Sequence, residues 1–432
     1  MFATLPDIES HIDALIASSQ YNDAIVNILV GVNNHMNLPS AARNFLYYPN
    51  FDRQMQDLSD ALVTESQPTT QNNLTDNTLI IASEMYPVGG HSRVIADIVR
   101  EIPSPIIVLT DMFWTFRTTP NRLNWLIDSM GDTTIIVLPQ LTPWAKCQGL
   151  YRLTQQLQPS NILYFNHHQD PIPFVGTLGH KGSRKTLVHH CDHSPSLGNT
   201  LNHVQHVDFV EEMAKTCANQ LGKETFMLPL HVQDRGKKDF PPITGSNFSA
   251  ATSGTHIKFA RTGEMSLQTI AQTVLSCIQG NFFHIGEINS EWVTEIKSYL
   301  ASVGLEPDRF VPLGQVPSVW NTLAKLDAHI YIGSAPKGGG RAAIEAQGCG
   351  YPLLFFRVND QGPALGSDSL YASKQLGWST LAELSTLLAE VGIQHQSLSL
   401  AARALYEQHY SRDEFVRVLK IIINNETVIA EK

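Results

Sequence analysis

Residues 328–356 read AHIYIG SAPKGGG RAAIEAQGCG YPLLFF and combine three local patterns in one short stretch. The apolar run at 328–333 is typical of a buried strand, and three consecutive glycines follow it. A helix is expected from about Arg341, and a second apolar run begins at Pro352. Strand–helix–strand units of this kind build parallel sheets with helices on their faces, so the stretch predicts an α/β fold.

The same alternation of apolar runs and helical stretches extends over most of the chain. Apolar runs that read as strands lie at 78–83, 105–110, 134–139, 161–166, 186–190 and 225–230, then at 256–261, 281–286, 309–314, 328–333 and 352–356. A stretch rich in glycine, proline, serine and lysine at 233–255 separates the two sets. We therefore predict two Rossmann-like, doubly wound domains, at 78–235 and 255–400, that face a cleft.

Helical periodicity marks both ends of the chain. Residues 1–70 are predicted to form a small helical region, and a C-terminal helix within 401–432 is predicted to pack back on the N-terminal domain. Three roles stay open for the N-terminal region: it extends an acceptor groove, braces the first domain or forms a dimer contact.

Composition excludes several classes of protein. The chain has 432 residues, 43% of them hydrophobic, and a formal net charge of −10, which disfavours nucleic acid as a main partner. Five widely spread cysteines form no CxxC pair, which argues against a disulfide framework and a structural zinc site. No basic leader and no apolar run long enough to span a membrane is evident, so we expect a cytoplasmic protein without a membrane span.

The loop at 337–341 has the chemistry of a phosphate site. Gly338, Gly339 and Gly340 let the backbone approach a ligand, and amides at a helix start suit an anion. Lys337 and Arg341 flank the glycines and can neutralise a diphosphate. The alternative is a tight turn followed by a surface pair between Arg341 and a glutamate four residues later.

This segment resembles the nucleotide-sugar signature of GT-B glycosyltransferases, especially the glycogen-synthase-like branch. The pattern E-G-F-G-x-x-x-x-E-A-x-x-x-G-x-P aligns with K-G-G-G-R-A-A-I-E-A-Q-G-C-G-Y-P. The resemblance implies that Glu345 binds the ribose of the donor. The first glutamate of the family falls on Lys337, a departure that leaves the stereochemistry open. A lysine at the diphosphate looks more like the inverting protein O-GlcNAc transferases and the bacterial adhesin N-glycosyltransferases.

A second glycine loop follows the run at 78–83. Gly89 and Gly90 resemble the loop that closes over donor and acceptor in GT-B enzymes. His91 stands at the expected helix start, where the dipole disfavours imidazolium and leaves a neutral ring that can accept a proton. A plain turn capped by Ser92 is the alternative.

The segment at 186–198 reads TLVHHCDHSPSLG and is rich in histidine. A metal site at His189, His190, Asp192 and His193 needs a convergence that strand geometry does not favour. We expect instead that His190 and His193 contact the donor sugar and that Asp192 raises the basicity of an imidazole. The resemblance to HHADH-type segments of bacterial GT-B proteins supports this interpretation, and a histidine-rich surface loop is the alternative.

Three further residues are donor-site candidates. Arg261 falls where many GT-B enzymes carry an arginine that binds the diphosphate, and a structural ion pair is its alternative role. Gln315 and Val316 follow the run that usually contacts the base, so the resemblance implies that they line the base pocket.

The leading hypothesis is a glycosyltransferase that moves a sugar from a UDP- or GDP-sugar to a glycan or protein acceptor. Lys337 and the loop amides would stabilise the leaving diphosphate, and His91 or Asp192 would be the base of an inverting mechanism. No cofactor or metal is expected, since the DxD pair of metal-dependent transferases is absent. A non-catalytic scaffold with this fold and a nucleotide-sugar 2-epimerase are the alternatives. The sugar, nucleotide, acceptor, anomeric outcome and oligomeric state stay open, including a homo-oligomer or a partner glycosylation protein.

Overall fold

A computed structural model describes residues 4–37, 47–66, 74–87, 90–118, 121–190, 195–357 and 376–424. Gly89, Asp192 and His193 of the candidate residues lie outside this part of the chain. Within it the chain divides into two compact units, the first of residues 4–228 and 416–424 and the second of residues 229–357 and 376–415. No helix of the described residues has the length and apolar character needed to cross a bilayer.

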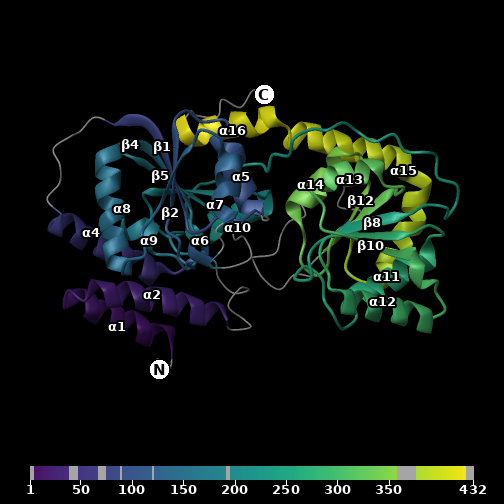
Figure 1. Ribbon diagram of the computed structural model, residues 1–432, viewed down its shortest axis with the longest axis horizontal. Helices are drawn as coiled ribbons and strands as arrows, with labels where there is room; N and C mark the ends of the chain where they lie inside the picture. The colour runs from purple at the N-terminus through teal and green to yellow at the C-terminus, as the bar shows by residue number, and fades with distance from the viewer. Residues whose placement is uncertain are drawn as a thin grey trace. The chain divides into compact units, whose positions relative to one another are not determined.

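The first unit is built on a seven-stranded parallel sheet with the order β3-β2-β1-β4-β5-β6-β7 (Figure 1). Its strands are β1 (Thr75–Ala82), β2 (Pro105–Leu109), β3 (Thr134–Val137), β4 (Pro159–Phe165), β5 (Arg184–Val188), β6 (Val204–Asp208) and β7 (Thr225–Met227). Its helices are α1 (Leu5–Ala17), α2 (Tyr21–Met36), α4 (Pro49–Glu65), α5 (Gly90–Val99), α6 (Thr115–Thr118), α7 (Asn121–Met130), α8 (Pro143–Leu157), α9 (Ile172–Val175) and α10 (Glu211–Leu221). Six of the seven strands are the predicted ones, and β6 is the strand that the pattern missed.

The N-terminal helices share one core with this sheet. Ile12 of α1, Ile28 of α2 and Phe51 of α4 belong to the same buried cluster as Leu79 and Ile81 of β1. In Figure 1 these helices lie on the side of the sheet that carries α8 and α9, with α5, α7 and α10 on the other side. Of the three roles considered for the N-terminal region, bracing of the first domain is the one that this packing shows directly.

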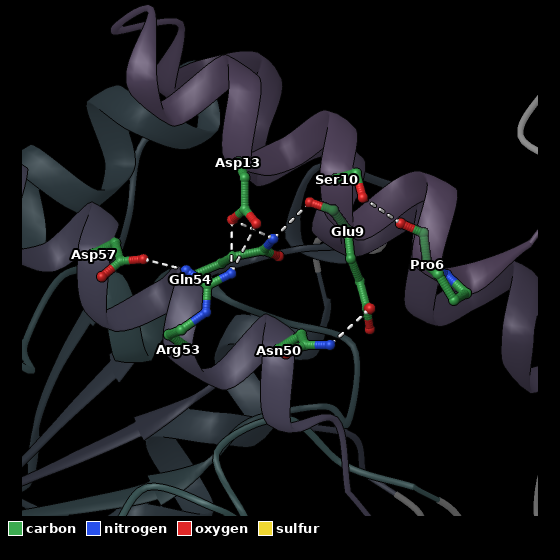
Figure 2. A network of polar contacts seen from close by, with 8 residues as sticks. All are labelled: Pro6, Glu9, Ser10, Asp13, Asn50, Arg53, Gln54 and Asp57. Carbon is green, nitrogen blue, oxygen red and sulfur yellow. Dashed lines mark hydrogen bonds and ion pairs between the residues drawn. The ribbon is translucent and has the colours of Figure 1, made fainter.

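Polar contacts fix α1 against α4 as well. Arg53 donates to both carboxylate oxygens of Asp13, at 2.7 and 2.9 Å, and Gln54 Nε2 bridges Asp13 and the Glu9 carbonyl oxygen (Figure 2). Gln54 is buried, so this amide contributes more than the exposed ion pair beside it.

The second unit holds a six-stranded parallel sheet with the order β10-β9-β8-β11-β12-β13. Its strands are β8 (Ala250–Ser253), β9 (Phe282–Ile285), β10 (Phe310–Gly314), β11 (Ile330–Ile332), β12 (Leu353–Phe356) and β13 (Gly377–Trp378). Its helical elements are α11 (Leu267–Cys277), α12 (Ser290–Ser302), η1 (Pro307–Arg309), α13 (Val319–Lys325), α14 (Gly340–Gly348) and α15 (Leu381–His409). Helix α16 (Arg412–Asn424) continues into the first unit, where Arg184 donates to the Ile423 carbonyl.

One strand prediction for this unit is wrong. The run at 256–261 forms turns and isolated bridges, and the strand lies earlier, at β8. Gly254 and Gly286 directly follow β8 and β9, and their backbones approach so closely that a Cβ on Gly286 would lie 2.3 Å from the Gly254 oxygen. Turns begin at His256, and β8 lies within the stretch that was predicted as a linker.

Candidate functional site

Three histidines gather at the carboxyl edge of the first sheet. His91 begins α5, His167 follows β4 and His190 follows β5. The rings of His91 and His190 stack with centroids 5.3 Å apart, and His190 also stacks on Phe165. The structure thus brings together two predicted candidates, His91 and His190, and adds His167, for which the sequence suggested no role.

The environment of His91 favours a neutral ring. Burial and, to a lesser extent, the neighbouring His190 lower its pKa from 6.5 to about 4. Helix α5 opens at Gly90, one residue before the helix start expected at His91. His91 Nε2 lies 2.9 Å from the Glu84 carbonyl oxygen, which can only accept. Nε2 therefore holds the ring hydrogen, and Nδ1 is the nitrogen left to accept a proton.

His167 is held beside this pair in the same neutral form. Burial lowers its pKa to about 4, with smaller effects from His190 and His91. Its backbone N–H donates to Ser83 Oγ at 2.7 Å, and its ring meets Phe113 edge to face. Three imidazoles that lower one another's pKa values by charge repulsion are not all charged together, so the cluster favours proton acceptance over cationic binding.

A buried carboxylate ties the strand ends beneath these rings. Asp170 is 0% exposed, and its Oδ2 accepts hydrogen bonds of 2.6 Å from Ser83 and Thr110. Its Oδ1 accepts from the Ile172 N–H at 3.1 Å. Burial raises the pKa of Asp170, while these donors and Lys146 oppose the rise. Asp170 thereby links the ends of β1, β2 and β4, which gives this residue a structural role.

The predicted glycine loop lies at the carboxyl end of β11 in the second unit. Gly339 is the N-cap of α14, and Gly340 is its first residue. Lys337 is exposed beside this helix start, and Arg341 is half-buried in the first turn. Ser334 Oγ donates to the Lys337 carbonyl at 2.7 Å, which closes the loop. A helix N-terminus and two cations therefore lie together, as a diphosphate site requires.

Lys258, to which the sequence pattern assigned no role, completes the loop. Lys258 Nζ donates to the Gly338 carbonyl at 2.8 Å, and the Lys258 carbonyl accepts from the Lys337 N–H at 3.3 Å. The wrong prediction of a strand at 256–261 hid this role, because Lys258 in a strand would not reach the loop after β11. The signal that could have found it is Gly254, which ends β8 four residues earlier.

Arg261 and Glu345 have partners within the second unit. The Arg261 guanidinium is half exposed and pairs with Glu295 at 2.7 Å, which is the alternative role considered for it. Its assignment to the diphosphate stays a prediction. Glu345 Oε2 accepts from the Trp320 N–H at 2.8 Å, at the start of α13. One carboxylate oxygen thus caps a helix, and Oε1 is the oxygen left for the predicted ribose contact.

The base-pocket candidates follow β10. Gln315 is exposed and Val316 is half-buried, just before α13 begins. Gly286 donates its N–H to the Gly314 carbonyl at 2.8 Å, so the ends of β9 and β10 stay together at this edge. Both residues stay candidates.

Comparison with known proteins identifies the fold. No protein-family model matches the chain, and no curated protein matches it in sequence. Among solved structures, a mutant O-GlcNAc transferase of Thermobaculum terrenum is 14% identical with a TM-score of 0.52 and covers 98% of this chain and 85% of its own. The lipopolysaccharide outer core galactosyltransferase WaaB, in its apo form, is 11% identical with a TM-score of 0.61 and covers 81% and 99%.

Anabaena HepE in complex with UDP and glucose is 16% identical with a TM-score of 0.56, covering 82% of this chain and 100% of its own. Proteins described with another activity share the fold. A putative UDP-N-acetylglucosamine 2-epimerase of Listeria monocytogenes is 12% identical with a TM-score of 0.51, covering 81% and 96%. The chain has the GT-B fold of two Rossmann-like domains.

Proposed function

We propose that this protein is a glycosyltransferase that takes a sugar from a UDP- or GDP-sugar and transfers it to a glycan or protein acceptor, without a metal at the donor. The observation that carries the proposal is the loop between β11 and α14. There Lys258, Lys337 and Arg341 surround a glycine-rich helix N-terminus. UDP is the first nucleotide to test, because the HepE structure of the same fold holds UDP and glucose.

In this mechanism the second unit binds the donor. The transition state is oxocarbenium-like, and negative charge develops on the departing diphosphate. The Lys337 ammonium, the Lys258 ammonium and the amides that open α14 stabilise that charge. Glu345 Oε1 accepts hydrogen bonds from the ribose hydroxyls, while Oε2 keeps its contact with α13. Arg261 is a second candidate cation for the diphosphate.

The first unit supplies the acceptor side. In an inverting reaction the acceptor hydroxyl or amide must lose a proton, and His91 Nδ1 is the atom we assign to accept it. His190 contacts the sugar, and Gly89, Asp192 and His193 keep the roles expected for them. In a retaining reaction the leaving phosphate would accept that proton, and His91 would be dispensable.

The 2-epimerase alternative has the comparison with the Listeria protein in its favour. Those enzymes generally show an acidic pair after the C-terminal glycine loop, whereas Arg341-Ala342-Ala343 follows it here. In the scaffold alternative the protein has the same fold but does not catalyse sugar transfer.

Thermal shift with UDP, GDP, CMP, dTDP and ADP and with their sugar conjugates tests the proposal. A ligand that binds only the native protein raises the melting temperature by mass action. We expect UDP or GDP to raise it in wild type and less so in Glu345→Gln. A protein that no nucleotide shifts would favour the scaffold. Interconversion of UDP-sugar epimers without an acceptor would favour the epimerase.

A further inference from the structure

Four side chains of metal-ligand type meet in the first unit, outside the site described above. They are His189, His206, Asp208 and Cys217, and one ligand atom from each lies within 4.8 Å of all the others. All four are at most 1% exposed. The cluster is therefore a closed interior site and not an acidic patch on the surface.

Strand register explains why these residues converge. His206 and Asp208 alternate along β6, so they share one face of the sheet. Val188 of β5 pairs with Val207 of β6, and the His189 N–H donates to the Val207 carbonyl at 2.8 Å. His189 thus lies beside Asp208 at the strand ends, and α10 brings Cys217 onto them. The spacing of these residues in the sequence does not reveal that they converge.

The contacts within the cluster are close but incomplete. Asp208 Oδ1 lies 3.0 Å from His189 Nδ1, and Cys217 Sγ lies 3.7 Å from each of those atoms. His206 Nε2 lies 3.1 Å from Asp208 Oδ2, yet the pair does not have the geometry of a hydrogen bond. Among the described residues, neither ring nitrogen of the fully buried His206 has a hydrogen-bond partner.

A buried imidazole nitrogen and a buried carboxylate oxygen that face each other without a hydrogen bond, as His206 Nε2 and Asp208 Oδ2 do, are costly unless something else binds them. A cation between His206 Nε2 and Asp208 Oδ2 would satisfy both atoms at once. The cluster also contains the ligand types that zinc prefers, namely two imidazoles, a carboxylate and a thiolate.

We propose that His189, His206, Asp208 and Cys217 bind one zinc ion in a tetrahedral structural site. Two Zn–N bonds, one Zn–O bond and one Zn–S bond form, the S–H bond of Cys217 breaks, and its proton passes to solvent. The charges balance, since one carboxylate and one thiolate neutralise the divalent ion. A tetrahedral zinc with Zn–N of about 2.1 Å and Zn–S of about 2.3 Å needs ligand atoms roughly 3.3–3.8 Å apart. The pairs at 3.0 and 3.1 Å would therefore separate slightly, and the wider pairs, within 4.8 Å, would come closer.

Four protein ligands leave no open position, so this zinc stabilises structure and does not activate water. It would join the end of β5 and the second half of β6 to the middle of α10. His189 directly precedes His190, so an occupied site would also hold the strand end from which His190 reaches the histidine cluster. The inference does not depend on the proposed glycosyltransferase activity.

The test is the metal content of the full chain, expressed without a polyhistidine tag in zinc-supplemented medium and dialysed against metal-free buffer. Elemental analysis by mass spectrometry should find about one zinc per chain in wild type. The variants Cys217→Ser and His206→Gln should hold much less. Cys147→Ser is the matched control, because Cys147 is also a buried free cysteine of the first unit and lies outside the cluster. It should retain the zinc.

Cobalt substitution keeps the test informative if the cluster variants do not fold. Wild-type protein reconstituted with Co²⁺ should show the intense visible bands of tetrahedral cobalt and a thiolate-to-cobalt charge-transfer band. Removal of zinc should lower the melting temperature, and zinc but not Mg²⁺ should restore it. Wild-type protein with no retained zinc would overturn the proposal. So would a cobalt spectrum without the thiolate band, or equal zinc in wild type and a folded Cys217→Ser variant.

Discussion

The imidazole of His91 stacks on the imidazole of His190, with their planes only 22° apart. A charge on either ring therefore disfavours a charge on the other, which adds to the burial that lowers the pKa of His91 to about 4. His91 Nε2 lies on the Glu84 carbonyl oxygen, which leaves Nδ1 as the acceptor.

His91→Gln should lower kcat for transfer by roughly 10²- to 10⁴-fold while leaving nucleotide affinity unchanged, because the base acts on the acceptor. The acidic limb of the wild-type kcat/KM profile should have a pKa of about 4. His180→Gln is the matched control, since burial lowers the pKa of His180 to about 4 too and no role at the site is assigned to it. Full turnover in His91→Gln would point to a retaining reaction.

Lys337→Ala and Lys258→Ala should each reduce kcat by roughly 10²-fold, because each removes a positive charge from the leaving diphosphate. Arg261→Ala should cost less, since its guanidinium is already paired with Glu295. Steady-state kinetics with saturating donor gives kcat for the Lys337, Lys258 and Arg261 variants. A larger loss in the Arg261 variant than in the Lys258 variant would assign the diphosphate to Arg261.

Glu345→Gln should weaken nucleotide binding by about 10- to 100-fold and leave the melting temperature of the free protein nearly unchanged. The amide oxygen of glutamine can still accept from the Trp320 N–H, so α13 keeps its cap. Glu345→Ala should lose both the nucleotide affinity and the contact with the Trp320 N–H, and the lost cap should cost about 1 kcal/mol of stability. Calorimetric titration with the nucleotide found by thermal shift measures the affinity. Equal affinity in wild type and Glu345→Gln would remove this carboxylate from the ribose.

Asp52→Ala should destabilise the protein by about 2–4 kcal/mol, because the carboxylate is buried and accepts from three donors across 146 to 148 residues of sequence. These donors are the N–H of Gly198 and the N–H and hydroxyl of Thr200. Urea denaturation gives the free energy of unfolding. Asp57→Ala on the same helix is the control, since Asp57 forms an exposed pair with Arg53 and its loss should cost under about 1 kcal/mol. Similar losses in both variants would contradict the bracing role.

Acid should weaken the first unit through His167. Burial lowers its pKa from 6.5 to about 4, so between these values the unfolded chain binds a proton that the native protein does not. The stabilising contribution is complete above pH 6.5 and is lost as the pH falls to about 4. Asp52 has the opposite effect on stability, because burial raises its pKa to about 6 and the native protein then binds a proton that the unfolded chain does not. The effect of His167 is therefore measured as the difference in unfolding free energy between wild type and a variant. Denaturation of wild type and His167→Gln at several pH values should show the smaller acid loss in the variant; parallel curves would contradict it.

Much of the fold could be predicted from the sequence because strands buried on both faces read as apolar runs. Strand β6 was missed because Gln205, His206 and Asp208 interrupt its apolar residues. His206 and Asp208 belong to the proposed zinc site. Strand β8 was misplaced because its residues, AATS, are small, while the run after it looks more like a strand.

The candidate site was predictable where its residues follow strands directly. The glycine loop and His91 lie at strand ends and helix starts, and the sequence marks both. Lys258 and the Glu345 contact with Trp320 depend on pairing between distant segments, which one sequence does not show. The same holds for Cys217, which is 28 residues from His189.

The shared core of α1, α2, α4 and the first sheet has a practical consequence. A shortened protein that began at β1 would expose the apolar side chains of the sheet that Phe51 and its neighbours now cover, and it would leave the loop at Gly198 without its anchor. Such fragments should be recovered as aggregates. Chimeras meant to exchange acceptor preference should therefore keep the N-terminal helices and the C-terminal residues 416–424 with the first sheet, with one junction in the segment that follows β7 and a second before residue 416.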